Sequence, residues 1–184
     1  VIAASGNSDL EMERVKKESM TALIMHEIGH TLGLNHNMKA SQLYSIEQLN
    51  DAEFIKGKSL TASVMDYAAL NVTRDRSKQG QYDDVAVGPY DLWAIQFGYK
   101  PFKSEMERQA LLKESTKPEH IFGNDADDMR SPGKAIDPRV NTSDQSNDPI
   151  AWAIDRIELS NDVMKDVKTR FTKTDASYQE LRRV

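Results

Sequence analysis

The chain has 184 residues, 39% apolar and 29% charged, which is typical of one compact globular domain. A net charge of −5 and a pI near 5.4 argue against nucleic-acid and anionic-membrane partners, because both attract clustered Lys and Arg. No apolar run approaches a membrane span, and the absence of cysteine excludes disulfides and thiolate zinc ligands. We therefore expect a protein or peptide substrate, with any secretion signal upstream of Val1.

The first predicted element is a long helix that begins at Ser8 or Asp9, either of which could cap it. Apolar residues recur along it at roughly helical spacing until Gly33. Residues 35–62 are mixed, with a short helical turn after Ser45 and loop elsewhere. A polar loop precedes the next clear signal.

Two further helices are expected in the second half of the chain. Pro89 begins one that ends near Gly98, because proline suits the first helical position and glycine the position after the last. Residues 114–149 form an aperiodic loop rich in Pro, Asp, Asn and Ser. Asp148 and Pro149 then cap a helical C-terminal part, for which we predict breaks near Ser160 and Thr174.

Residues 26–36 read His-Glu-x-x-His-x-x-Gly-x-x-His and carry three of the four histidines. His26 and His30 are four residues apart, so on a helix they lie about 40° apart around the axis and both rings can reach one ion. His36 would point about 240° away from His30 on a continuing helix. The helix must therefore break between them, and Gly33 stands where the left-handed turn is needed.

Three neutral imidazoles leave the fourth tetrahedral position of a zinc ion open, which is the catalytic pattern. Glu27 lies beside the metal position, where a carboxylate can take a proton from a metal-activated water. The predicted site therefore has His26, His30 and His36 as ligands of one zinc and Glu27 as general base. A set of unrelated core histidines is the less favoured reading.

This motif, followed by Ser-Val-Met-Asp-Tyr at residues 63–67, resembles the metzincin clan of zinc endopeptidases. The resemblance implies that Met65 is the Met-turn methionine beneath the zinc. It also implies that Tyr67 stabilises the oxyanion, as the tyrosine of astacins and serralysins does. Ordinary packing remains an alternative for both residues. Residues 91–99 resemble the helix that follows the Met-turn, and we assign them no chemistry.

The sequence at residues 35–38, 63–67 and 87–91 is similar to that of large bacterial zinc-dependent metalloproteases described as Met-zincins. That resemblance implies a secreted or envelope-exposed protein. Metzincins place a mixed sheet before the active-site helix, and only some 20 residues precede the motif here. We therefore expect a mainly α chain within an α+β parent, with the upstream sheet largely missing and possibly supplied by an upstream part of the same polypeptide.

Two secondary sites have competing interpretations. Carboxylates in the Gly123–Asp128 loop suit calcium, but a solvated acidic loop is favoured because the spacing does not match an EF-hand. His120 is expected to be a surface residue.

The expected organisation has three parts: the active-site helix, Met-turn and following helix at 1–113, a polar loop at 114–149, and a C-terminal helical extension of the same domain at 150–184. The predicted function is a zinc-dependent endopeptidase. Two alternatives stay open: an exopeptidase on the same metal site, and a zinc-binding but inactive fragment or module.

Overall fold

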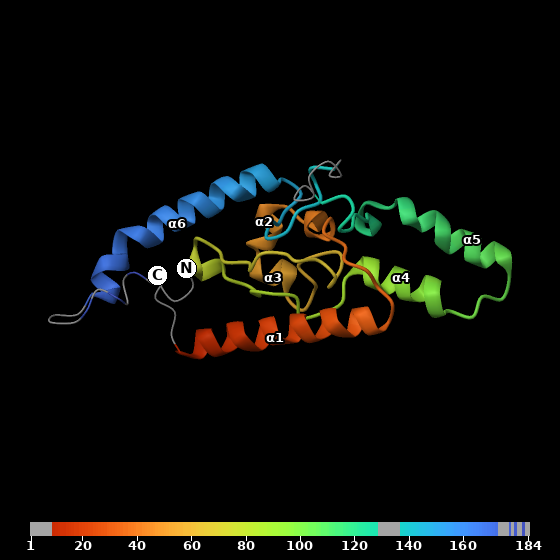
Figure 1. Cartoon of the computed structure of the whole chain (residues 1–184), viewed down its shortest axis with the longest axis horizontal. Coiled ribbons are helices and arrows are strands. Elements are labelled where there is room, and N and C mark those ends of the chain that lie inside the picture. Colours follow the sequence, from red (N-terminus) through yellow and green to blue (C-terminus); the bar gives the residue numbers. More distant parts are fainter. Residues whose placement is uncertain (1–8, 129–136, 173–176, 178, 180–181, 183–184) are drawn as a thin grey trace.

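A computed structural model describes residues 9–128, 137–172, 177, 179 and 182 (Figure 1). The predicted mainly α character is confirmed, and no strand occurs among the described residues. The α-helices are α1 (Asp9–Thr31), α2 (Ile46–Leu49), α3 (Ala52–Ile55), α4 (Pro89–Tyr99), α5 (Glu105–Lys113) and α6 (Pro149–Phe171). Short 3₁₀ turns occupy Ala40–Leu43, Arg76–Lys78, Glu114–Thr116 and Pro118–His120.

The long helices lie on the outside of a loop-rich centre. In Figure 1, α1 runs along one side of the molecule, α6 lies along the opposite side, and α4 and α5 lie together at one end. The short helices α2 and α3 lie between them, within the segment that connects the metal-binding motif to α4. The functional residues therefore come from α1 and from the loops packed against it.

Helix starts follow the side-chain signals in the sequence. Ser45 caps α2 through a capping box with Gln48. Asp148 caps α6 by accepting a hydrogen bond from the Ala151 amide at 2.9 Å, with Pro149 in the first turn. These short-range bonds explain why both helices begin where the sequence predicts.

Two predictions about helices in the second half of the chain need correction. Helix α6 continues through Ser160, because the Ser160 hydroxyl donates to the Arg156 carbonyl at 2.9 Å and is satisfied inside the helix. The predicted break near Thr174 lies outside the described residues. Helix α5 was not predicted, although Ser104 caps it by accepting from the Glu107 amide.

Two small buried clusters hold the loop-rich centre. Val15 of α1, Val72, Tyr82 and Leu159 of α6 pack together, so that this cluster ties both long helices to the central segment. Leu49, Ile55 and Leu60 form the second cluster, around α2 and α3. Burial of such side chains contributes on the order of 1.5–3 kcal/mol each.

One face of α1 carries large apolar side chains that remain exposed. Four of these side chains have exposed fractions of 50–56%: Met20, Leu23, Ile24 and Ile28. His26 and Gly29, on the other face, are buried. The described residues therefore cover only the metal-binding side of this helix.

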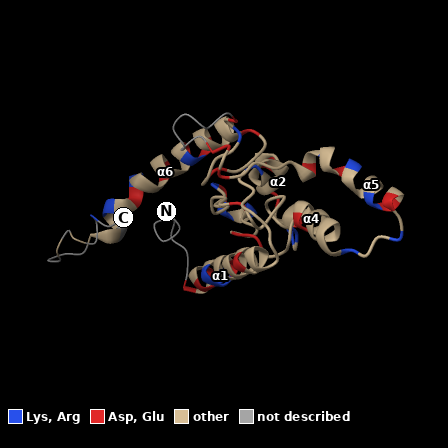
Figure 2. Ribbon diagram, turned by 45° about the vertical axis from the view of Figure 1, so that its right-hand side comes forward, with Lys and Arg blue, Asp and Glu red and all other residues tan. Residues whose placement is uncertain are grey.

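Charged residues are dispersed over the helices. Figure 2 shows Lys and Arg spread over α1, α5 and α6, with Asp and Glu between them. None of the described helices is long and apolar enough to cross a membrane.

Candidate metal centre

The end of α1 positions the first two histidines and turns the chain towards the third. The Gly33 amide donates to the His30 carbonyl and the Leu34 amide donates to the Gly29 carbonyl, both at 3.0 Å. Gly33 has a φ of 85°, so this is a Schellman turn with glycine in the left-handed position. The helix ends where the spacing of the motif requires it to end.

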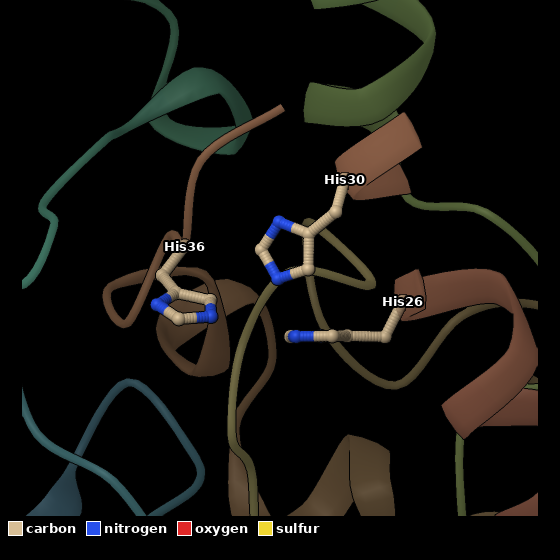
Figure 3. A group of neighbouring side chains, drawn as sticks. All are labelled: His26, His30 and His36. Atoms are coloured by element: carbon tan, nitrogen blue, oxygen red, sulfur yellow. The ribbon is translucent and has the colours of Figure 1, made fainter. Parts of the chain in front are cut away.

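The three histidine side chains converge on one point (Figure 3). The ring centroids of His26 and His30 are 4.8 Å apart, and that of His36 lies 5.4 Å from His26 and 4.8 Å from His30. One nitrogen of each ring lies within 4.8 Å of the others. Among the described residues, this is the group of histidines and carboxylates close enough to hold a metal ion.

Each ring is oriented by a hydrogen bond at its Nδ1 atom. His26 Nδ1 lies 2.8 Å from the Val64 carbonyl oxygen and His30 Nδ1 lies 3.1 Å from that of Leu34. His36 Nδ1 lies 2.9 Å from Asp125 Oδ2. Carbonyl oxygens only accept, so Nδ1 of His26 and His30 must donate, which leaves each neutral ring with its Nε2 lone pair for a metal. The donor set fits a zinc ion with three imidazole ligands.

Burial favours the neutral form of His26. It lowers the pKa of the imidazole, and the neighbouring His30 and His36 act in the same direction, whereas the Val64 carbonyl opposes them. Metal binding requires a neutral ring. The buried ligand is therefore held in the state that a metal needs.

Asp125 was missed as a functional residue. Its loop was expected to be a calcium site or a solvated acidic loop, and neither expectation includes the contact of Asp125 with His36. The calcium alternative has no support among the described residues, where the carboxylates of this loop do not form a group close enough to hold an ion. Asp125 instead fixes the ring of a metal ligand 89 residues away.

Asn37, directly after the third histidine, holds the Asp125 loop in place. Its side-chain amide donates to the Ile121 carbonyl at 3.0 Å, and its Oδ1 accepts from the Gly123 amide at 3.1 Å. The Met38 amide also donates to the Gly123 carbonyl at 2.8 Å. Asn37 is fully buried, and its two hydrogen bonds hold the loop that brings Asp125 next to His36.

Met65 lies fully buried beneath the motif. A Cβ atom at Gly29 would lie 2.3 Å from the Met65 sulfur, so this close approach requires glycine between the two helical histidines. The Asn37 amide donates to the Met65 carbonyl at 3.0 Å, which ties the turn to the segment that carries His36.

Asp91 in the first turn of α4 holds the 63–67 turn from behind. Its carboxylate accepts from the Ser63 hydroxyl at 2.5 Å and from the Val64 and Gly88 amides at 2.9 and 2.8 Å. Since the Val64 carbonyl orients His26, Asp91 supports a metal ligand through the turn. Helix α4 is thus a structural element next to the site.

Tyr67 and Glu27 are the remaining predicted site residues. The Tyr67 hydroxyl lies 2.7 Å from His36 Nε2, and its ring centroid lies 5.0 Å from that of His26. Glu27 is exposed on α1 and lines a cavity together with His26 and Tyr67. The structure therefore places Tyr67 against a ligand nitrogen and Glu27 in the wall of a cavity next to His26.

The prediction of a surface position for His120 was wrong. This residue is buried, its Nδ1 donates to the Glu114 carbonyl at 2.8 Å, and its ring stacks on Trp93 of α4 at 5.4 Å. The cause is that the segment after α5 folds back onto α4, which no local pattern indicated. His120 is a satisfied core histidine.

Comparison with known proteins gave one family. A family model described as Met-zincin matches residues 8–184. No curated protein and no solved structure matches the chain.

Proposed function

Because this chain belongs to the Met-zincin family, which indicates a zinc metalloprotease, we propose that it is an endopeptidase with Glu27 as its general base. The observation that carries the proposal is the convergence of His26, His30 and His36 with each Nδ1 atom in a hydrogen bond. This supports a site in which the Nε2 atoms of the three rings would hold one ion, with the Tyr67 hydroxyl 2.7 Å from His36 Nε2 and Glu27 in the wall of the adjoining cavity.

When bound, zinc supplies Lewis acidity, which lowers the pKa of a water molecule towards neutral pH and polarises a carbonyl group. The Glu27 carboxylate accepts the proton of the attacking water and delivers it to the leaving amine. The Tyr67 hydroxyl donates to the oxyanion that develops on the scissile carbonyl. Met65 supplies an apolar floor under the histidines. No covalent bond between protein and substrate is required.

Metal content and proteolysis together test this function. Plasma mass spectrometry is expected to find about one zinc per chain, and casein cleavage is expected to stop on addition of a chelator. Glu27→Gln is expected to retain zinc and lose turnover, whereas His30→Ala is expected to lose both. A Glu27→Gln protein with full activity would overturn the assignment.

The exposed apolar face of α1 supports a second candidate. Leu23, Ile24 and Ile28 are 50–52% exposed on the helix that carries the metal ligands, and an apolar patch of this kind suits a covering partner. We propose that an upstream part of the same polypeptide packs there. Zinc binding without casein cleavage by the 184-residue chain would favour a metal-binding module that needs this segment.

A further inference from the structure

A cavity of about 210 Å³ lies beside the metal centre, on the side of Glu27. One wall comes from α1 and the other from the segments around residues 64–68 and 83–84. Its lining includes His26, Glu27, Asp66, Tyr67, Asp83 and Asp84. We call it the acidic cavity. It shares His26, Glu27 and Tyr67 with the site, so whatever it binds lies next to the reacting group.

The charge of the acidic cavity is one-sided. Four carboxyl groups line it, from Glu27, Asp66, Asp83 and Asp84, and none of its lining residues is Lys or Arg. Among the ion pairs formed by described residues, none includes any of these four carboxylates. Several carboxylates elsewhere are paired with cations, as Asp137 is with Lys39 at 2.7 Å. The four carboxyl groups of the cavity lack such a cationic partner.

Asp66 shows the deficit most clearly. Its Oδ2 accepts from the Ser41 amide at 2.6 Å, but its buried Oδ1 has no hydrogen-bond partner among the described residues. Burial, together with repulsion from Asp144 and Asp84, raises the pKa of this carboxyl well above its usual range. A buried acceptor without a donor costs about 1–3 kcal/mol. Because this oxygen is closed to solvent, a cation in the cavity would stabilise the ionised Asp66 carboxyl through its charge rather than through a direct hydrogen bond to Oδ1.

The cavity suits an organic cation better than a metal ion. Among the described residues, only the three histidines bring ligand atoms close enough to hold an ion, so Asp66, Asp83 and Asp84 do not form a metal site. The volume lies below the roughly 300–1,000 Å³ of pockets for drug-sized ligands. It fits a single side chain, and spread carboxylates match the several donors of a guanidinium or ammonium group.

We propose that the acidic cavity binds the Lys or Arg side chain of the substrate residue next to the scissile bond. This inference rests on the proposed function and deepens it by naming a substrate class. Asp66 and Asp83 are the residues that select the cation. Asp84 supports the wall, because its carboxylate accepts from the Thr61 hydroxyl at 2.7 Å and from the Leu60 amide.

Binding is measured on zinc-loaded Glu27→Gln protein, in which cleavage is expected to be absent. Three fluorescein-labelled peptides share an alanine and glycine frame and differ at one central residue, which is arginine, lysine or the neutral arginine analogue citrulline. The arginine and lysine peptides are expected to bind about tenfold tighter than the citrulline peptide. Equal affinities, or no binding of any peptide, would overturn the proposal.

Charge-removing variants locate the selectivity. Asp66→Asn and Asp83→Asn in the same background are expected to reduce the ratio of arginine to citrulline affinity towards one, because both keep the shape of the side chain. Glu13→Gln is the matched control: it removes an exposed carboxylate of α1 that pairs with Lys16 and is expected to leave the ratio unchanged. If both cavity variants keep the ratio of arginine to citrulline affinity found for the Glu27→Gln protein, the cation binds elsewhere and the proposal is overturned.

Cleavage of a proteome-derived peptide library by the wild-type protein separates the two hypotheses. Cuts concentrated within one residue of Lys or Arg support the acidic cavity. Chelator-sensitive cuts without such a preference overturn the cavity proposal and leave the endopeptidase standing. Absence of cuts together with cation-selective binding would instead contradict the endopeptidase and retain the cavity.

Discussion

Glu27 separates two regions in which polar groups are satisfied to different degrees. On the metal side, Nδ1 of each histidine has an oxygen partner within 3.1 Å. On the side of the acidic cavity, Asp66 Oδ1 has no partner among the described residues, and burial raises the pKa of Asp66, Asp83 and Asp84. The first region is arranged to hold a resident metal ion. The second lacks positive charge, which a cationic substrate side chain would supply under our proposal.

The largest expected effect comes from breaking the support of the metal side. Asp91→Ala leaves the Ser63 hydroxyl and the Val64 and Gly88 amides without their buried acceptor. We expect the free energy of unfolding to fall by about 3–5 kcal/mol and zinc binding to weaken, because the Val64 carbonyl orients His26. Urea unfolding and zinc titration measure both.

Asp148→Ala is the matched control for this variant. It removes an aspartate at the start of another helix with proline in its first turn, but that side chain accepts one amide bond remote from the metal. Its cost is expected to be about 1 kcal/mol, with unchanged zinc affinity. Equal losses in the two variants would show that Asp91 acts only as a helix cap.

The next effect concerns the acidic cavity and its dependence on pH. Burial raises the pKa of Asp84 to about 7 from an ordinary value of 3.8, so the folded protein holds this proton more tightly than the unfolded chain. The stability that this proton contributes is fully present below about pH 4 and is lost as the pH rises to about 7. Asp84→Asn should remove this dependence.

Chelator-treated wild-type and Asp84→Asn proteins are therefore compared by urea unfolding at pH 4.5 and pH 7.5. The variant is expected to gain on the wild type as the pH rises, by an amount on the order of a few kcal/mol. Stability curves that stay parallel across this range would contradict the shift assigned to Asp84.

The smallest effect is expected at the exposed edge of the metal side. Asp125→Ala removes the acceptor of His36 Nδ1, and loss of such a partner typically lowers metal affinity about 10–100-fold. Folding stability should hardly change, because the Asp125 side chain is 63% exposed. Competition with a zinc chelator measures the affinity. Glu53→Ala, which removes an exposed carboxylate elsewhere, should bind zinc like the wild type.

Local signals in the sequence predicted most of the helices. Proline and aspartate at helix starts marked α4 and α6, and a left-handed glycine marked the end of α1. Errors arose where a side chain had two possible partners: Ser160 reads as a helix breaker, yet its hydroxyl bonds back to Arg156 within α6. A residue pattern does not say which of these bonds forms.

The part of the site that the sequence predicted consists of the metal ligands, which lie close together along the chain. His26, His30 and His36 lie within eleven residues, so helix geometry brings His26 and His30 together and the glycine turn at Gly33 returns the chain so that His36 can join them. Asp125 orients His36 from 89 residues away, and Asp66 and Asp84 reach the cavity only after the chain has folded around α2 and α3. Contacts that depend on the path of long loops have no periodic signal.

The enclosure of Met65 has a consequence for resistance to oxidants. Methionine sulfoxide is polar and bulkier than the thioether, and Met65 is fully buried with its sulfur against the Gly29 backbone. Met20, Met106 and Met164 are 56%, 80% and 64% exposed. We therefore expect an oxidant in solution to react with these exposed methionines before it reaches the sulfur beneath the histidines.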